Sequence, residues 1–126
     1  MKPEAIRTDR APKAIGPYSQ AIRVAETIYV SGQLPIDPST GTLVRGGIRE
    51  QTRQTILNLG AIVESAGGSV NSIVRVTFFL ARWDDFGAMN EVCADLFREP
   101  YPARSTIQNS RPMEALVGAD AIAVIA

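Results

Sequence analysis

The clearest pattern in the chain is a row of apolar or small residues at helical spacing between positions 48 and 66. Steps of three and four residues place this row on one side of a helix, at Ile48, Thr52, Ile56, Leu59, Val63 and Ala66. Most charged residues of the segment fall on the other side. Gly67 and Gly68 follow directly, and glycine ends helices because it adopts the left-handed cap conformation without a steric penalty. The pattern predicts an amphipathic helix from Ile48 to Ala66.

A second, shorter helix is predicted after Asp84 and Asp85, either of which can serve as its N-cap. Its inward side is expected to carry Phe86, Met89, Cys93, Leu96 and Phe97. Pro100 and Pro102 then prevent the helix from continuing. Between the two helices, residues 73–80 are rich in β-branched and aromatic side chains and predict a strand. One of its faces carries the apolar row Val74, Val76, Phe78 and Leu80, and the other carries Ile73, Arg75, Thr77 and Phe79.

Four more strands and one turn complete the predicted elements. The strands are expected at Ala21–Val24, Thr27–Ser31, Arg104–Gln108 and Gly118–Ile125, and the turn at Asp37–Gly41. This order predicts an α+β fold in one domain, 1–126, with both helices on one face of a sheet. The opposite face would carry Ile73, Phe79 and much of 121–125, and a chain of 126 residues has little left to cover it. We therefore expect the chain to self-associate, so that copies of the protein cover this apolar face.

Composition narrows the possible chemistry. Thirteen basic and thirteen acidic residues cancel, so there is no net-charge attraction to nucleic acid or to an anionic membrane. The chain has no histidine, which excludes Ser-His-Asp and Cys-His catalysis and histidine metal sites. Its single cysteine, Cys93, excludes an internal disulfide and is expected to be a buried structural thiol. No apolar run approaches a membrane span and the first residues lack a signal core, so a cytoplasmic location is expected.

Several short motifs resemble those of the RidA family, also called the YjgF family. The first is AIGPYSQA at 14–21, and the others follow in the family's order: VSGQ at 30–33, QT at 51–52, NL at 58–59, DF at 85–86 with Asn90, and PARS at 102–105. Each piece is weak, but the ordered set is specific and covers nearly the whole chain. The resemblance implies a homotrimer of a chorismate-mutase-like α+β fold, with a mixed sheet, a central barrel and a cleft between each pair of subunits.

The resemblance also implies an activity, namely hydrolysis of reactive 2-imino or enamine acids, such as 2-iminobutanoate and 2-iminopropanoate, to 2-keto acids and ammonia. No metal and no organic cofactor is implied. Arg104 matches the family arginine that holds the substrate carboxylate, and a guanidinium suits this role because its planar fork forms two parallel hydrogen bonds. Tyr18 matches a tyrosine of the cleft, so Arg104 and Tyr18 are the candidate catalytic residues. The candidate substrate-binding residues are Arg104, Tyr18, Ser31, Gly32, Phe86, Asn90 and Thr106.

Two positions depart from the family pattern. The cysteine often found two residues after the arginine is Thr106 here, which keeps a polar contact and removes thiol chemistry. Active members typically carry Glu-x-Glu on the final strand, and the first glutamate positions the attacking water. This chain reads Gly118-Ala119-Asp120, so the first position has no side chain. Asp120 lies about 7 Å further along the same strand face and could replace that glutamate only if the strand bulged.

The departure at Gly118 leaves two functions open. The first is the imine hydrolase, in which the protein mainly orients an electrophilic imine and a water. The second is a binding protein that keeps the arginine cleft for a small carboxylate and has lost hydrolysis. The endoribonuclease or translation-inhibitor activity often attributed to the family is less favoured, because the chain has no basic run and few aromatic residues to stack on bases.

Overall fold

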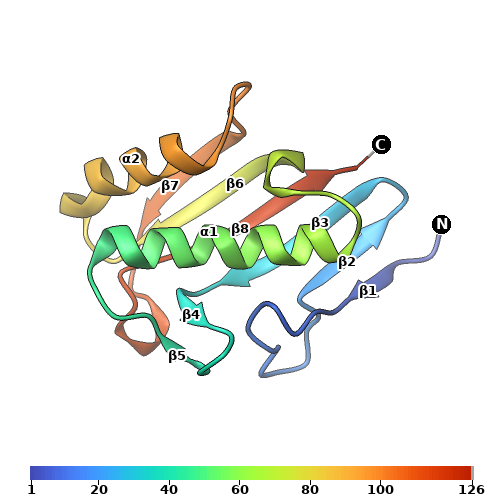
Figure 1. The fold of residues 1–126 in the computed structure, drawn as a ribbon, viewed down its shortest axis with the longest axis horizontal. Helices are drawn as coiled ribbons and strands as arrows, with labels where there is room; N and C mark the ends of the chain where they lie inside the picture. Colours follow the sequence, from blue (N-terminus) through green and yellow to red (C-terminus); the bar gives the residue numbers. More distant parts are fainter. Residues whose placement is uncertain (126) are drawn as a thin grey trace.

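The computed structural model describes residues 1–125 of the chain, and its elements follow the predicted order (Figure 1). The two helices are α1 (Ile48–Ser65) and α2 (Phe86–Leu96). The strands are β1 (Glu4–Ile6), β2 (Ala21–Val24), β3 (Thr27–Gln33), β4 (Ile36–Asp37), β5 (Thr42–Leu43), β6 (Ile73–Leu80), β7 (Ala103–Gln108) and β8 (Val117–Val124). Short 3₁₀ turns lie at Val70–Ser72, Trp83–Asp85 and Pro112–Glu114.

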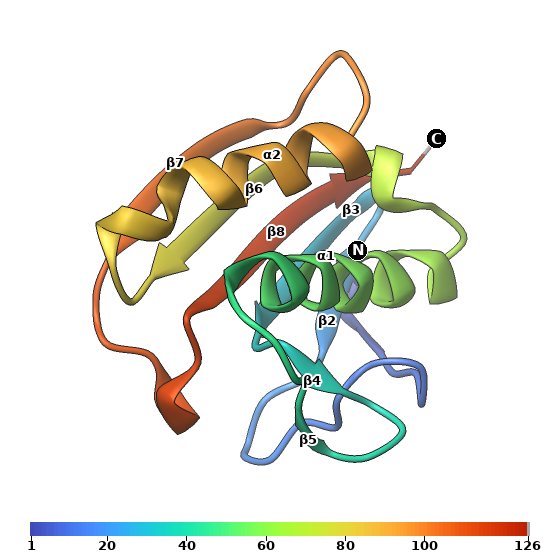
Figure 2. The same cartoon turned by 60° about the vertical axis from the view of Figure 1, so that its left-hand side comes forward.

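Six strands form one mixed sheet in the order β1-β2-β3-β8-β6-β7. All neighbours are antiparallel except β6 and β7, which are parallel because α2 makes the crossover between them. Both helices lie on the same face of this sheet, α1 over its centre and α2 over β6 and β7 (Figures 1 and 2). The fold is therefore the predicted α+β arrangement. The small hairpin β4–β5 and the edge strand β1 were not predicted.

The core fills the space between the helices and the sheet. From α1 it receives the predicted row, and Thr52, Ile56, Leu59 and Val63 are fully buried. From the sheet it receives Ile28, Phe78 and Ala123, with the largest contribution from the ring of Phe78. A fully buried aliphatic or aromatic side chain contributes about 1.5–3 kcal/mol through the hydrophobic effect. The helix ends at Ser65, and Gly67 shortly after it adopts the predicted left-handed conformation, with φ of +100°.

The predicted faces of β6 are wrong at its first two residues. Ile73 lies in the core, whereas Val74 is 48% exposed, because the pairing of β6 with β8 shifts between Ile73 and Arg75. A β-bulge adds one residue to one strand and so reverses the alternation of its side chains. From Val76 onward the predicted row is correct, since Val76, Phe78 and Leu80 are all buried. The bulge thus places Ile73 on the face opposite to the predicted one.

The start of α2 also differs from the prediction. Asp85 occupies the N-cap position but makes no side-chain hydrogen bond to the helix, and its backbone is helical. The 3₁₀ turn Trp83–Asp85 leads directly into the helix, so the chain does not enter α2 from an extended residue, as a capping aspartate requires. Asp85 instead lies 3.5 Å from the guanidinium of Arg82. The inward side of α2 is as predicted, with Met89, Cys93 and Phe97 buried.

The sheet face opposite the helices, called the open face below, is largely apolar. Its exposed or half-buried apolar members come from five strands and include Ile22, Tyr29, Val74, Phe79, Ile107, Ile122 and Val124. Arg75, Thr77 and Asp120 also lie on it. On β8 the residues alternate, so that Ala121 and Ala123 are in the core while Ile122 and Val124 face outward. No element of residues 1–125 covers this face (Figure 2). Among the same residues, neither helix is long and apolar enough to cross a membrane.

Candidate active site

Arg104 lies on the edge strand β7, on the side that faces α2. Its register partner on β6 is Val76, which points into the core, and paired residues of neighbouring strands share a face. Thr106 follows two residues later and therefore points the same way. The guanidinium carbon of Arg104 is 5.5 Å from the centroid of the Phe86 ring, within the range of a cation–π interaction. Parallel pairing and the helix crossover thus bring three predicted residues together.

A cleft of about 290 Å³ opens beside this arginine, between α2 and the end of β7. Its wall consists of Val76, Asn90, Cys93, Ala94, Phe97, Tyr101, Pro102 and Arg104. The side-chain oxygen Oδ1 of Asn90 is buried and accepts no hydrogen bond from the described residues. A buried acceptor without a donor is costly, and a ligand that donates a hydrogen bond would remove that cost. The cleft is therefore lined by one residue with guanidinium donors, Arg104, and by one whose buried amide oxygen has no donor, Asn90.

Cys93 is part of the same wall and is buried as a free cysteine. Burial raises the pKa of its thiol to about 11, although the positive charge of Arg104 and a hydrogen bond from it act in the opposite direction. At neutral pH the group is thus a thiol and not a thiolate, which is the nucleophilic form. The predicted structural role of Cys93 agrees with this burial.

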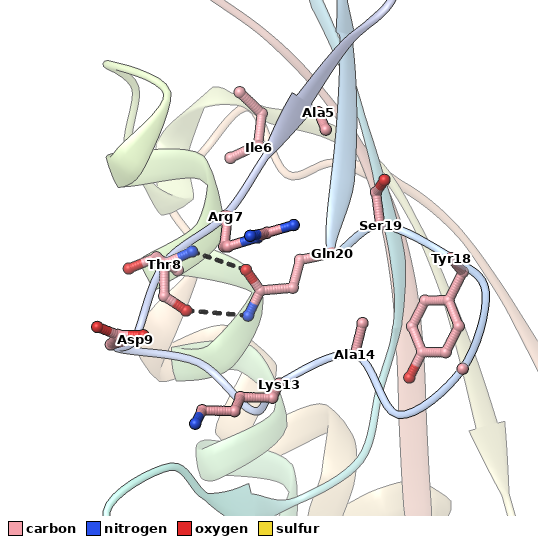
Figure 3. Close-up of a pocket in the computed structure, with 11 residues that line it drawn as sticks. Ala5, Ile6, Arg7, Thr8, Asp9, Lys13, Ala14, Tyr18, Ser19 and Gln20 are labelled. Carbon is pink, nitrogen blue, oxygen red and sulfur yellow. Dashed lines mark hydrogen bonds between the residues drawn. The ribbon is translucent and has the colours of Figure 1, made fainter.

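Tyr18 belongs to a loop between β1 and β2 that Gln20 holds together (Figure 3). The Gln20 amide accepts from the Thr8 amide at 2.7 Å and donates to the Thr8 carbonyl at 3.0 Å, and it also donates to the Pro12 carbonyl at 2.8 Å. The Tyr18 hydroxyl accepts from the Ile15 amide at 3.3 Å, and its ring is half exposed. This loop encloses a separate cavity of about 390 Å³ with Arg7 and Lys13 on its rim.

Ser31 and Gly32 lie at the irregular end of β3, next to that loop. The pairing of β3 with β8 shifts between Val30 and Gln33, so both residues fall within a bulge. The Ser31 hydroxyl donates to the Ser19 carbonyl at 2.6 Å, which joins the bulge to the Tyr18 loop. A side chain at Gly32 would meet no atom within 4 Å, so the backbone there is open to a ligand.

The predicted site residues therefore form two separate groups in one chain. Phe86, Asn90, Arg104 and Thr106 form the arginine half-site, and Tyr18, Ser31 and Gly32 form the loop half-site. Two strands, β8 and β6, lie between β3 and β7. Neighbouring strands are about 4.8 Å apart, so the two half-sites are separated by roughly 14 Å. A single subunit does not bring them together.

Gly118 lies beside the loop half-site, on the open face. A side-chain carbon placed on it would be 3.2 Å from the Gln33 carbonyl oxygen and 3.2 Å from Nη1 of Arg111. The pairing of β8 with β6 is continuous from Val117 to Ile122, so β8 does not bulge toward β6 at Gly118 and Asp120 keeps its distance along the strand. Burial raises the pKa of Asp120, and the charge of Arg75 opposes that shift.

Arg111 is a candidate residue that sequence reasoning missed. It lies in the loop between β7 and β8, and its guanidinium carbon is 4.8 Å from the centroid of the Phe79 ring. The sequence gives no motif at this position and shows only an arginine before a proline. The position of Arg111 next to Gly118 follows only from the pairing of β6 with β8, because that pairing places Phe79, on which Arg111 packs, opposite Gly118.

Comparison with known proteins identifies the family. The family model described as Endoribonuclease L-PSP, which represents the RidA family, matches residues 8–125. The chain belongs to the RidA family. A RutC family protein of Pyrococcus abyssi is 51% identical over 98% of both chains. The mouse 2-iminobutanoate/2-iminopropanoate deaminase is 46% identical and matches 96% of this chain and 90% of its own length.

The fold of this RidA family member agrees with solved structures. RidA from an Antarctic Psychrobacter species superimposes with a TM-score of 0.93 at 42% identity, over 97% of this chain and 99% of the other. The resemblance inferred from short motifs is thereby confirmed over nearly the full length, together with the α+β fold.

Proposed function

We propose that this RidA family member hydrolyses reactive 2-imino acids of the 2-iminobutanoate and 2-iminopropanoate type to 2-keto acids and ammonia. The observation that carries the proposal is the cleft that Arg104 and Asn90 both line, in which the buried side-chain oxygen of Asn90 has no hydrogen-bond donor among the described residues. A 2-imino acid offers a carboxylate and an N–H group on adjacent carbons, which match these two groups. Relatives of 40–46% identity that bear the name of this deaminase support the assignment.

In the proposed reaction, Arg104 binds the carboxylate through two parallel hydrogen bonds and fixes the plane of the substrate. The protonated imine donates a hydrogen bond to Oδ1 of Asn90. Water adds to the imine carbon, the C=N π electrons move to nitrogen, and the added water loses one proton to solvent, which gives a neutral carbinolamine. The hydroxyl proton then moves to nitrogen, the C=O bond forms as the C–N bond breaks, and ammonia leaves. Because the iminium is already electrophilic, orientation of substrate and water supplies most of the catalysis.

The complete site requires a neighbouring subunit in this proposal. The arginine half-site and the loop half-site are roughly 14 Å apart within one chain, and the apolar open face has no cover. A homotrimer in which the open faces meet would bury that apolar surface and bring Tyr18, Ser31 and Gly32 of one subunit to Arg104 of the next.

A cytoplasmic location stays a prediction from the sequence.

The alternative function is a binding protein for a small carboxylate without hydrolysis, and Gly118 favours it. No carboxylate side chain of β8 stands at that position to hold the attacking water, and Asp120 does not take its place. The endoribonuclease activity named in the family description has less support. The chain is neutral overall, and the arginine cleft of about 290 Å³ suits a small molecule.

A trapping assay separates these functions. A pyridoxal-phosphate threonine dehydratase generates 2-iminobutanoate in the presence of semicarbazide, which traps the imine. We expect this protein to lower the yield of semicarbazone in proportion to its concentration. Unchanged trapping together with calorimetric binding of 2-oxobutanoate would instead support the binding protein. Absence of both activities would refute both functions.

A further inference from the structure

We infer that Arg111 is a specificity-determining residue that receives the second carboxylate of a dicarboxylic 2-imino or 2-oxo acid. The inference rests on the proposed function for the placement of the first carboxylate at Arg104. It goes beyond that function because it names a different substrate class, a dianion in place of a monoanion. The grounds are the position of Arg111, its free donors and the rigidity of its loop.

The Arg111 guanidinium lies over the backbone of Gly118, beside the loop half-site. Gly118 offers no side chain, and Nη1 of Arg111 is 3.2 Å from the point where one would begin. The carbonyl oxygen of Gln33 is equally close to that point, so the guanidinium lies beside the bulge that contains Gly32. A side chain at Gly118 would crowd the guanidinium. Because Gly118 has no side chain, the Arg111 guanidinium lies beside β8 without that crowding.

The donors of this guanidinium are mostly unused. Its only side-chain hydrogen bond to the described residues runs from Nε to the Ser110 carbonyl at 3.2 Å. No carboxylate among residues 1–125 lies within 4.0 Å of it. The Phe79 ring beneath the guanidinium holds one face by a cation–π contact and leaves the in-plane N–H groups available. The planar fork of a guanidinium with unused N–H groups fits a carboxylate through two parallel hydrogen bonds.

The loop that carries Arg111 is strained and held at both ends. Met113 and Glu114 adopt positive φ values of 60° and 59°, which residues other than glycine rarely do. The Asn109 amide donates to the Leu80 carbonyl at 2.9 Å, and the Leu116 amide donates to Oε1 of Gln51 at 2.8 Å. Strained backbone persists only where the surrounding structure enforces it, and it is common at ligand sites. The loop therefore holds the backbone at Arg111 in place, and the Phe79 ring supports its guanidinium.

A monocarboxylic imino acid needs one cation, which Arg104 supplies. When the loop half-site of one subunit faces the arginine half-site of the next, the proposed cleft contains two arginines from opposite walls. Two fixed positive charges match a dianion and leave one guanidinium without a partner when the ligand has a single carboxylate. We therefore expect four- and five-carbon dicarboxylic acids to bind more tightly than 2-oxobutanoate.

The test is a calorimetric titration of 2-oxoglutarate, oxaloacetate and 2-oxobutanoate into wild type, Arg111→Gln and Arg111→Lys. Loss of a charge-assisted contact corresponds to roughly ten- to 150-fold in affinity. Arg111→Gln should lose about that factor for the better dicarboxylate and change less than about twofold for 2-oxobutanoate, with Arg111→Lys in between. The matched control is Arg53→Gln, which removes the same charge from the exposed side of α1 and should change neither affinity.

The outcomes keep this inference separate from the proposed enzyme activity, because binding is measured without turnover. A dicarboxylate preference that depends on Arg111, in a protein that fails the trapping assay, refutes the hydrolysis of 2-iminobutanoate alone. Equal affinities for both classes in a protein that hydrolyses imines refute the role of Arg111 alone. Loss of trimer stability in Arg111→Gln with unchanged affinities would also overturn the inference, because Arg111 would then pair with a carboxylate of a neighbouring subunit.

Discussion

The hydroxyl of Ser31 donates its proton to the carbonyl oxygen of Ser19 at 2.6 Å, and this bond joins the bulge of β3 to the loop that carries Tyr18. The Ser31 amide adds a second bond, to the Gln20 carbonyl at 2.9 Å. A serine hydroxyl has a single proton, so toward a ligand Ser31 can only accept a hydrogen bond. The sequence predicted Ser31 as a substrate contact. This geometry favours instead a role for Ser31 in positioning the loop that carries Tyr18.

Replacement of Ser31 by alanine should therefore act through the loop. We expect a several-fold rise in KM with a smaller change in kcat, since one neutral hydrogen bond contributes about 0.5–1.5 kcal/mol. Hydrogen exchange of the amides of 14–19 should become faster. Ser39→Ala is the matched control, because Ser39 lies in the exposed turn after β4. Weaker ligand binding with unchanged exchange would show that Ser31 contacts the ligand directly.

The sequence predicted the positions of the helices and strands better than it predicted which of their residues face the core. Periodicity was sufficient for α1 and for the buried end of β6, where Phe78 and Leu80 alternate regularly with outward residues. It failed at Ile73, because a bulge depends on the partner strand and leaves no local signal. The two half-sites could not be located either, since the distance from Ser31 to Arg104 depends on the order of the strands. Arg111 became a candidate only through its packing on Phe79.

The open face should hold the trimer together. Light scattering of the wild type at micromolar concentration should give about three times 13.6 kDa. Tyr29→Asp places a charge in the centre of this face and should shift the mass toward the monomer, because burial of an unpaired charge costs several kcal/mol. Leu57→Asp is the control, since Leu57 is also 50% exposed but lies on α1. A monomeric wild type would contradict both the assembly and the shared cleft.

Gly118→Glu tests the missing carboxylate. If water positioning limits the rate, hydrolysis should rise, and general-base assistance typically amounts to about 10²–10⁴-fold. Two contacts oppose this gain. The new Cβ lies 3.2 Å from the Gln33 carbonyl oxygen, and the new carboxylate comes close to the Arg111 guanidinium. Part of the gain should therefore appear only in the double variant Gly118→Glu/Arg111→Gln. Gly118→Gln has the same size without the charge and should give no gain.

If the wild type is active and Gly118→Glu leaves its rate of hydrolysis unchanged, another group already orients the water. The Thr106 hydroxyl or a backbone carbonyl would be such a group. Thermal melts of the three variants show whether the close contact with Gln33 destabilises the fold. A large loss of stability in Gly118→Gln would mean that the comparison reports packing and not chemistry.

The thiol of Cys93 should resist alkylation in the native protein. Burial raises its pKa from 9.0 to about 11, so the thiolate is scarce at pH 8 and its population grows as the pH rises toward 11. Labelling with iodoacetamide at pH 8 should be slow in buffer and rapid in urea, where the pKa returns to its ordinary value. Arg104→Ala removes the nearby positive charge and should slow native labelling further. Equal rates in buffer and urea would contradict the buried position.

Arg104 is the residue on which both candidate functions depend. Lysine keeps the charge but cannot form the planar fork, so Arg104→Lys should weaken binding of 2-oxobutanoate and Arg104→Ala should nearly abolish it. A charge-assisted hydrogen bond contributes about 1.5–3 kcal/mol, which corresponds to roughly ten- to 150-fold in affinity. The measurement is a calorimetric titration of the three proteins, with Arg53→Ala as a control for the loss of one surface arginine.

Stability should change little in these variants, because Arg104 is exposed and its main contact is the Phe86 ring at 5.5 Å. A cation–π pair at an exposed site contributes about 0.5–1 kcal/mol, so the melting temperature should fall by only a few degrees. Equal affinities across the three proteins would refute the carboxylate role. Unfolding of Arg104→Ala at room temperature would instead assign Arg104 a structural role, in which its contacts with Phe86 and Cys93 hold α2 against the edge of the sheet.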